Sequence, residues 1–243
     1  MNAPARFQTL LPNKVQEKIK KIKTPFDVQE FLFSMPYNAE ERDRSPLNVI
    51  LDQQCHCLDG GFLAAILLWK LEFKPLVLDL TPAPGLDDDH VLALFQIEGR
   101  WGAVAKSNFL QLGFREPVFK NIRELAMSYF EHYMSTARQK TLRGYTRPMD
   151  LSTLDPAWMW DESAANRLYK KFYARKPIPL ITSPMEKRLN LVRENIFHVD
   201  IPNYHPLLPF LIFVALLVIF THRKNVVRLI NGNESKISFS KKK

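Results

Sequence analysis

The sequence predicts an α+β fold with a separate apolar helix near the C-terminus. An apolar run over residues 57–69 has the composition and length of a buried helix. Short apolar segments bounded by turn residues predict strands at 75–80, 90–97 and 101–105. Residues 207–220 carry no charged side chain and none that forms hydrogen bonds. The helix, the strands and the apolar segment together define this fold class.

Caps and periodicity predict the remaining elements. Helix 25–35 has the clearest start, because Thr24 can cap it and Pro25 suits its first position. Other predicted helices lie at 13–22, 119–135, 155–173 and 185–197, with a proline-rich extended linker at 176–184. We divide the 243 residues into N-terminal helices (1–45), a core (46–140), an extension and linker (141–203), an apolar helix (204–222) and a basic tail (223–243).

Charge and cysteine content exclude several classes of protein. The net charge is +9, and residues 223–243 hold +6 of it through seven Lys/Arg and one acid. The rest of the chain has no basic face interleaved with aromatic residues, so we expect no nucleic-acid partner. Two cysteines are too few for a disulfide scaffold and suit a reducing compartment.

The chemistry of the chain is predicted to involve Cys57 and His90. Cys57 opens the apolar helix, where the helix dipole favours a thiolate. His90 begins the second strand, and a thiol with an imidazole is what a cysteine nucleophile requires. The acidic turn 87–89 is either a solvated turn or a source of negative charge that raises the pKa of His90. The alternative for Cys57 is an inert, buried thiol.

Residues 57–108 resemble the core of the transglutaminase-like superfamily. The resemblance is carried by a cysteine that heads a small-residue helix, a histidine that opens a hairpin, a glycine in its turn and a tryptophan after it, which are Cys57, His90, Gly99 and Trp101. It implies that the cysteine helix packs on an antiparallel sheet. It also implies thiol chemistry on amide bonds, although the family includes members that have lost activity.

One position departs from the family pattern. The family carries an aspartate that orients the histidine where this chain has Ala105. We expect Ser107 or Asn108 to replace that aspartate, and we expect Ala105→Asp to raise any activity. Backbone N–H groups at the start of the helix, together with Gln54, are the expected donors to an oxyanion.

The run Cys55-His56-Cys57 does not predict a metal site. Adjacent side chains cannot easily converge on one ion, and structural zinc sites place about two to four residues between paired ligands. We therefore expect neither a metal nor another cofactor.

The apolar segment is predicted to cross a membrane. From Tyr204 to His222 it approaches the roughly 20 residues that a span needs, and aromatic and cationic residues flank it. The alternative is a buried or interfacial helix. Residues 1–11 lack a signal-peptide pattern, so we expect a single-pass C-terminal anchor with the main domain in the cytoplasm, although the basic tail opposes that orientation.

Two hypotheses for function follow. In the first, Cys57 attacks an amide carbonyl of a protein or peptide to give a thioester, and His90 moves the proton. Water as acceptor gives hydrolysis and an amine gives cross-linking; the sequence leaves that choice open, as it does the oligomeric state. In the second, Ala105 marks a degenerate site, and the fold serves as a membrane-anchored binding or scaffold protein.

Overall fold

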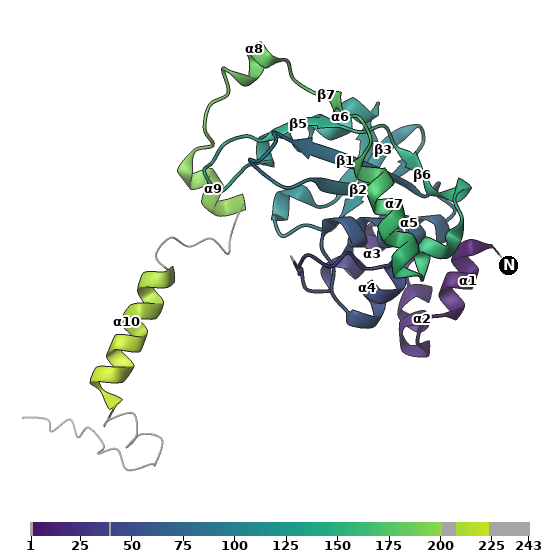
Figure 1. The fold of residues 1–243 in the computed structure, drawn as a ribbon, viewed down its shortest axis with the longest axis horizontal. Helices are drawn as coiled ribbons and strands as arrows, with labels where there is room; N and C mark the ends of the chain where they lie inside the picture. The colour runs from purple at the N-terminus through teal and green to yellow at the C-terminus, as the bar shows by residue number, and fades with distance from the viewer. Residues whose placement is uncertain (1, 39, 201–207, 224–243) are drawn as a thin grey trace, which may run out of the picture. The chain divides into compact units, whose positions relative to one another are not determined.

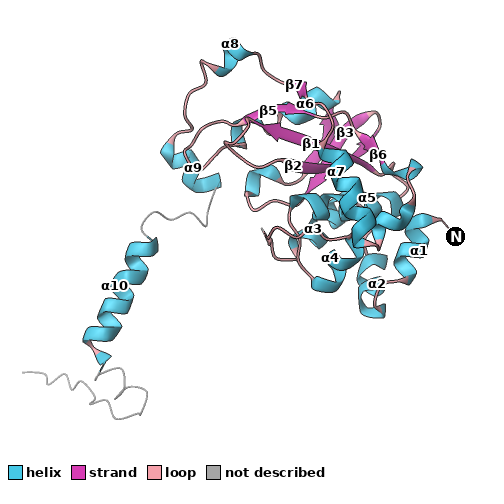
Figure 2. Ribbon diagram, viewed as in Figure 1, coloured by secondary structure: helices cyan, strands magenta, loops and turns pink. Residues whose placement is uncertain are grey.

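The computed structural model describes residues 2–38, 40–200 and 208–223. It contains two compact units, Met1–Asp200 and Ile201–Lys243, which we describe separately. The first unit is built on one antiparallel sheet with helices packed against it (Figure 1). Figure 2 shows the strands gathered in one layer, with α3, α4, α5 and α7 on one side of it.

The sheet of the first unit is a set of hairpins. Its strands are β1 (Leu76–Pro82), β2 (His90–Ile97), β3 (Arg100–Ala105), β4 (Arg115–Phe119), β5 (Leu142–Tyr145), β6 (Met149–Asp150) and β7 (Ile178–Pro179). Their order is β4-β3-β2-β1-β5-β7, and β6 also pairs with β1. The β2–β3 hairpin turns through Glu98 and Gly99, whose φ angles of 49° and 75° suit a two-residue turn. Its register sets Leu92 opposite Ala105.

Helix α5 (Cys57–Lys70) packs on one face of the sheet. The same apolar core includes residues of α1 (Ala3–Thr9), α2 (Asn13–Lys20), α3 (Pro25–Phe33), α4 (Pro46–Asp52) and α7 (Glu162–Tyr173). A Cβ at Gly61 would lie only 2.8 Å from Cγ1 of Val91, so a glycine is required where the helix meets β2. The close contact fixes the start of α5 against the start of β2.

A second apolar core covers the opposite face. Alternate strand residues such as Leu78, Leu92 and Ala105 point there and pack with α6 (Ile122–Met127) and Tyr129. Beyond the sheet, the chain continues through two short helices, α8 (Ser183–Glu186) and α9 (Glu194–Asp200). The expected mixture of helices and antiparallel strands is therefore present.

Several predicted elements differ in extent. The helix at 25–35 is confirmed as α3, with Thr24 in a capping box. The helix predicted at 119–135 is instead the end of β4, then α6 and a 3₁₀ turn, because Asn121 caps a new start. Asp161 likewise interrupts 155–173 by capping α7 through the backbone N–H of Ala164 (2.6 Å). The expected linker at 176–184 contributes β7, and 185–197 holds only parts of α8 and α9.

The apolar segment forms α10 (Leu208–Thr221) in the second unit. Its 14 residues fall short of the roughly 20 that a span requires, and no helix within the described residues is long and apolar enough to cross a membrane. The predicted membrane-spanning helix is therefore wrong, and the single-pass location and the membrane partner that depended on it are withdrawn. Residues 204–207 and the basic tail from residue 224 lie outside the described residues.

Candidate active site

The thiol of Cys57 is held at the first turn of α5. His56 is the N-cap residue, and its Nδ1 accepts a hydrogen bond from the backbone N–H of Leu58 at 3.3 Å. The Asp59 carboxylate in turn accepts from the backbone N–H of His56 at 2.9 Å. The Asp59 half of this capping box does not depend on the charge of the His56 ring, and it fixes the helix start. The Sγ atom of Cys57 donates to the carbonyl oxygen of Asp89 at 3.4 Å, in the turn before β2.

Cys57 and His90 line one cavity of about 60 Å³. The wall around them includes Tyr37, the acidic turn 87–89, Ser107, Leu112 and Tyr133. The fold thus brings together three of the residues singled out from the sequence, which are Cys57, His90 and Ser107. Asn108 is exposed and Gln54 is half-buried, and neither is among the described residues that line this cavity.

His90 is buried and its tautomer is fixed. Its Nε2 lies 2.7 Å from the carbonyl oxygen of Leu112. A carbonyl only accepts hydrogen bonds, so Nε2 carries the proton and Nδ1 keeps the free lone pair. The rings of Tyr129 and Tyr133 stand edge-on to the imidazole, each 6.3 Å away. Burial lowers the pKa of His90 to about 4, so the acidic turn does not raise it.

The partner of His90 Nε2 is neither Ser107 nor Asn108. The Ser107 hydroxyl accepts from the backbone N–H of Phe109 at 2.9 Å. Ala105 lies on the His90 face of the sheet and is fully buried. The side-chain amide of Gln29 forms two hydrogen bonds with the backbone of Ala105. Its oxygen accepts from the Ala105 N–H at 3.0 Å, and its nitrogen donates to the Ala105 carbonyl at 2.8 Å. His90 Nε2 is bonded to the Leu112 carbonyl instead, and a backbone group leaves no mark in the sequence.

A second imidazole, that of His56, forms a hydrogen bond with the Cys57 side chain. Its Nε2 lies 3.4 Å from the Asp43 carboxylate and 3.7 Å from that of Asp59. Burial favours the neutral ring, but the hydrogen bonds to Asp43 and Cys57 and the charge of Asp59 raise the pKa of His56 to about 10. In the protonated ring Nδ1 is a donor and cannot accept from Leu58, so at neutral pH the bond from the backbone N–H of His56 to Asp59 holds the helix start. A cation therefore stands beside the sulfur at neutral pH.

Tyr37 covers the thiol from a distant part of the chain. A parallel bridge between Tyr37 and Cys55 holds it there, with the backbone N–H of Asn38 bonded to the Cys55 carbonyl at 3.1 Å. The Tyr37 hydroxyl is within hydrogen-bonding reach of both the backbone N–H and the side chain of Cys57, and burial raises its pKa. No local sequence signal indicated this residue, because the bridge is a tertiary contact.

The other thiol belongs to the core. Cys55 is fully buried, and burial raises its pKa to about 12, so it is a poor nucleophile. Within the part of the chain that the structure describes, no group of three or more His, Cys, Asp or Glu side chains is arranged to hold a metal ion. The chemistry available at the site is that of Cys57 with two imidazoles.

Comparisons with known proteins give short or distant matches. No protein-family model matches the chain. A glycerol-3-phosphate acyltransferase from Pelodictyon phaeoclathratiforme is 40% identical over 68 residues. The match covers 28% of this chain, and the chain spans 28% of the length of that relative.

Comparison with solved structures also gives distant matches. LapG from Legionella pneumophila has 14% identity and a TM-score of 0.35, over 47% of this chain and 76% of LapG. EGTA-treated LapG from Legionella pneumophila has 13% identity and a TM-score of 0.38, over 67% of this chain and 98% of the LapG chain. A candidate cysteine protease from Cytophaga hutchinsonii has 18% identity and a TM-score of 0.35, over 47% of this chain and 42% of the protease chain. TM-scores below 0.5 do not establish a common fold.

Proposed function

We propose that this chain is a thiol enzyme that acts on amide bonds of proteins or peptides, with Cys57 as nucleophile and His90 as base. One observation carries the proposal: both side chains line a single cavity, and the Nε2–H of His90 is already bonded to the Leu112 carbonyl. The lone pair for proton transfer is therefore on Nδ1. A pKa of about 4 keeps this imidazole neutral at physiological pH, as a base must be.

The proposed reaction begins when Sγ of Cys57 bonds to the amide carbonyl carbon and its proton passes to Nδ1 of His90. The C–N bond then breaks, His90 returns the proton to the leaving amine, and a thioester remains on Cys57. The backbone N–H of Cys57 is the proposed donor to the oxyanion. Because the Tyr37 hydroxyl now adjoins that N–H, it must shift when substrate binds. Water or an amine then takes the acyl group.

A second candidate is a peptide-binding protein with an inactive site. Two observations favour it: Sγ donates to the Asp89 carbonyl, and burial of His90 disfavours the imidazolium that proton transfer would create. In that case a peptide would occupy the Cys57 cavity without reacting.

Trapping of the acyl intermediate separates the two candidates. The full chain is incubated with a casein digest and hydroxylamine, which intercepts a thioester whether the natural acceptor is water or an amine. We expect peptide hydroxamates, detected by mass spectrometry, with the wild type and with the control Cys55→Ser. Cys57→Ser should form none. Equal, background amounts from wild type and Cys57→Ser would favour the binding protein.

A further inference from the structure

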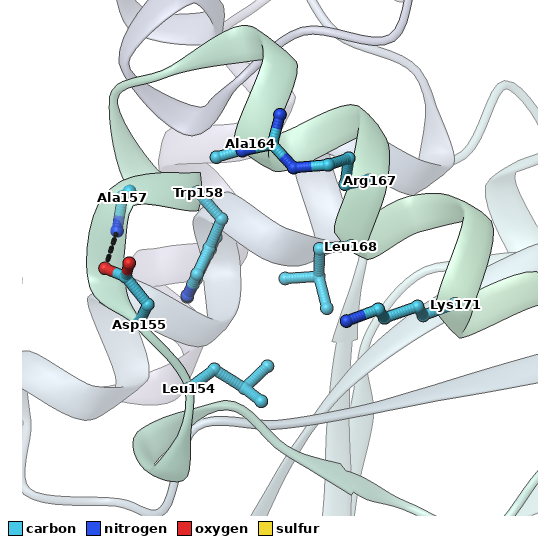
Figure 3. A pocket seen from close by; sticks show the side chains of 8 residues that line it. All are labelled: Leu154, Asp155, Ala157, Trp158, Ala164, Arg167, Leu168 and Lys171. Atoms are coloured by element: carbon cyan, nitrogen blue, oxygen red, sulfur yellow. Dashed lines mark hydrogen bonds between the residues drawn. The ribbon is translucent and has the colours of Figure 1, made fainter.

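A second cavity lies beside α7 and shares no lining residue with the Cys57 cavity. Its volume is about 240 Å³. Figure 3 shows its walls, with Leu154 and Leu168 as apolar surfaces, Trp158 on one side and Lys171 on the other. It is large enough for a short aliphatic group and a polar head.

Trp158 presents an unsatisfied donor at this cavity. The residue is 2% exposed, and its ring packs edge-on against Phe62 of α5, with centroids 5.7 Å apart. The indole Nε1 is buried and has no hydrogen-bond partner among the described residues. Figure 3 shows this nitrogen directed toward Leu154, which is 37% exposed. A buried N–H without a partner is unfavourable, so an acceptor there would stabilise the site.

Two cations stand at the rim, on successive turns of α7. Arg167 and Lys171 are exposed, and within the described residues neither forms a hydrogen bond or an ion pair. Figure 3 shows the Lys171 ammonium turned over Leu168, toward the cavity. The one acidic residue of the lining, Asp155, caps the backbone N–H of Ala157 at 3.0 Å. Asp155 keeps its negative charge and a second acceptor oxygen, so the side chains of the lining carry two positive charges and one negative charge.

We propose that this cavity binds a small aliphatic carboxylate. The apolar part would lie against Leu154 and Leu168, and the carboxylate would accept hydrogen bonds from Trp158 Nε1 and from Lys171. A carboxylate suits this set because it only accepts hydrogen bonds and carries the complementary charge. Free short-chain acids and the C-terminus of a peptide ending in leucine share this chemistry.

The indole N–H signal of Trp158 reports binding directly. We would titrate the full ¹⁵N-labelled chain with N-acetylleucine, which mimics a peptide C-terminus, and with hexanoate as a free acid. Trp158→Phe assigns the signal among the four tryptophans. We expect a saturable downfield shift of this N–H, and the tighter ligand identifies the source. N-acetylleucinamide, which has the same side chain without the charge, should bind at least about tenfold more weakly.

A matched pair of variants tests the cation. Lys171→Gln should weaken N-acetylleucine roughly fivefold or more. Lys170→Gln removes the same charge one residue away, from an exposed position that lines a different cavity, and should leave the affinity unchanged. An unmoved Trp158 signal, equal shifts with acid and amide, or equal losses in the two lysine variants would each overturn the proposal.

Discussion

His56 forms a hydrogen bond with the Cys57 side chain and His90 lines the same cavity as Cys57, yet their surroundings shift the two pKa values in opposite directions. His56 lies beside the carboxylates of Asp43 and Asp59, and its pKa is raised to about 10. His90 lies among tyrosine rings with a carbonyl as its partner, and burial lowers its pKa to about 4. The same side chain thus becomes a fixed cation in one place and a neutral base in the other. In our proposal His90 moves the proton and His56 only supplies charge.

Removal of His90 should have the largest effect. His90→Gln keeps a donor for the Leu112 carbonyl but has no basic nitrogen, so hydroxamate formation should fall on the order of 100-fold or more. His56→Gln removes the charge beside the sulfur, and its loss should be nearer tenfold. Initial rates of hydroxamate release at pH 7 measure both. The reverse order would make His56 the base.

A carboxylate placed next to His90 tests why the two imidazoles differ. Ala105→Asp should destabilise the fold by roughly 3–5 kcal/mol, because the new charge is buried in an apolar cluster and Nε2 is already bonded to Leu112. This reverses the gain in activity expected from the sequence. Urea unfolding gives the free energy, and Ala105→Ser, which adds no charge, should cost less. A stable and more active Ala105→Asp would mean that aspartate displaces the Leu112 carbonyl.

The same contrast separates what the sequence predicts from what it cannot. Local patterns predict the helix that begins at Cys57, the strand that begins at His90 and the hairpin that follows it. The signals for these elements, which are the apolar run, the short apolar segments and the turn glycine, each lie within a short stretch of the chain. Local patterns do not indicate the roles of the Leu112 carbonyl and the Tyr37 hydroxyl, since one is a backbone group and the other arrives through a tertiary bridge. The protonation of His90 depends on burial, and that of His56 depends on Asp43, which lies 13 residues away in the sequence, as well as on the local Asp59.

Stability should depend on pH differently for the two imidazoles. The folded pKa of His90, about 4, lies below the ordinary 6.5, so the unfolded chain binds this proton more readily. Stability should therefore fall by roughly 3 kcal/mol as pH drops from 6.5 to 4. For His56 the pKa is raised, so its contribution is complete below pH 6.5 and is lost as pH rises toward 10.

Urea unfolding between pH 4 and pH 10 checks both signs. His90→Gln should flatten the acid side of the profile and leave the alkaline side, whereas His56→Gln should do the opposite. A variant that flattened both sides, or neither, would contradict the separate assignments of the two rings.

Asp43→Asn should give the smallest effect and the most specific one. The Asp43 side chain is 40% exposed, so its ion pair with His56 is screened and worth only about 0.2–1 kcal/mol. Without that charge the pKa of His56 moves back toward its ordinary value, while Asp59 remains in place. A loss of about 1 kcal/mol lowers this pKa by about 0.7 units, so at pH 10 more of the rings would be neutral, and hydroxamate formation should fall about threefold or less. At pH 6 the ring stays protonated and the rate should hardly change.

The control is Glu41→Gln, which removes an exposed neighbour that lines the same outer cavity as Asp43. This variant should leave the rate of hydroxamate formation unchanged at both pH values. An equal loss at pH 6 and pH 10 would show that Asp43 acts through the position of its side chain and not through the charge of His56.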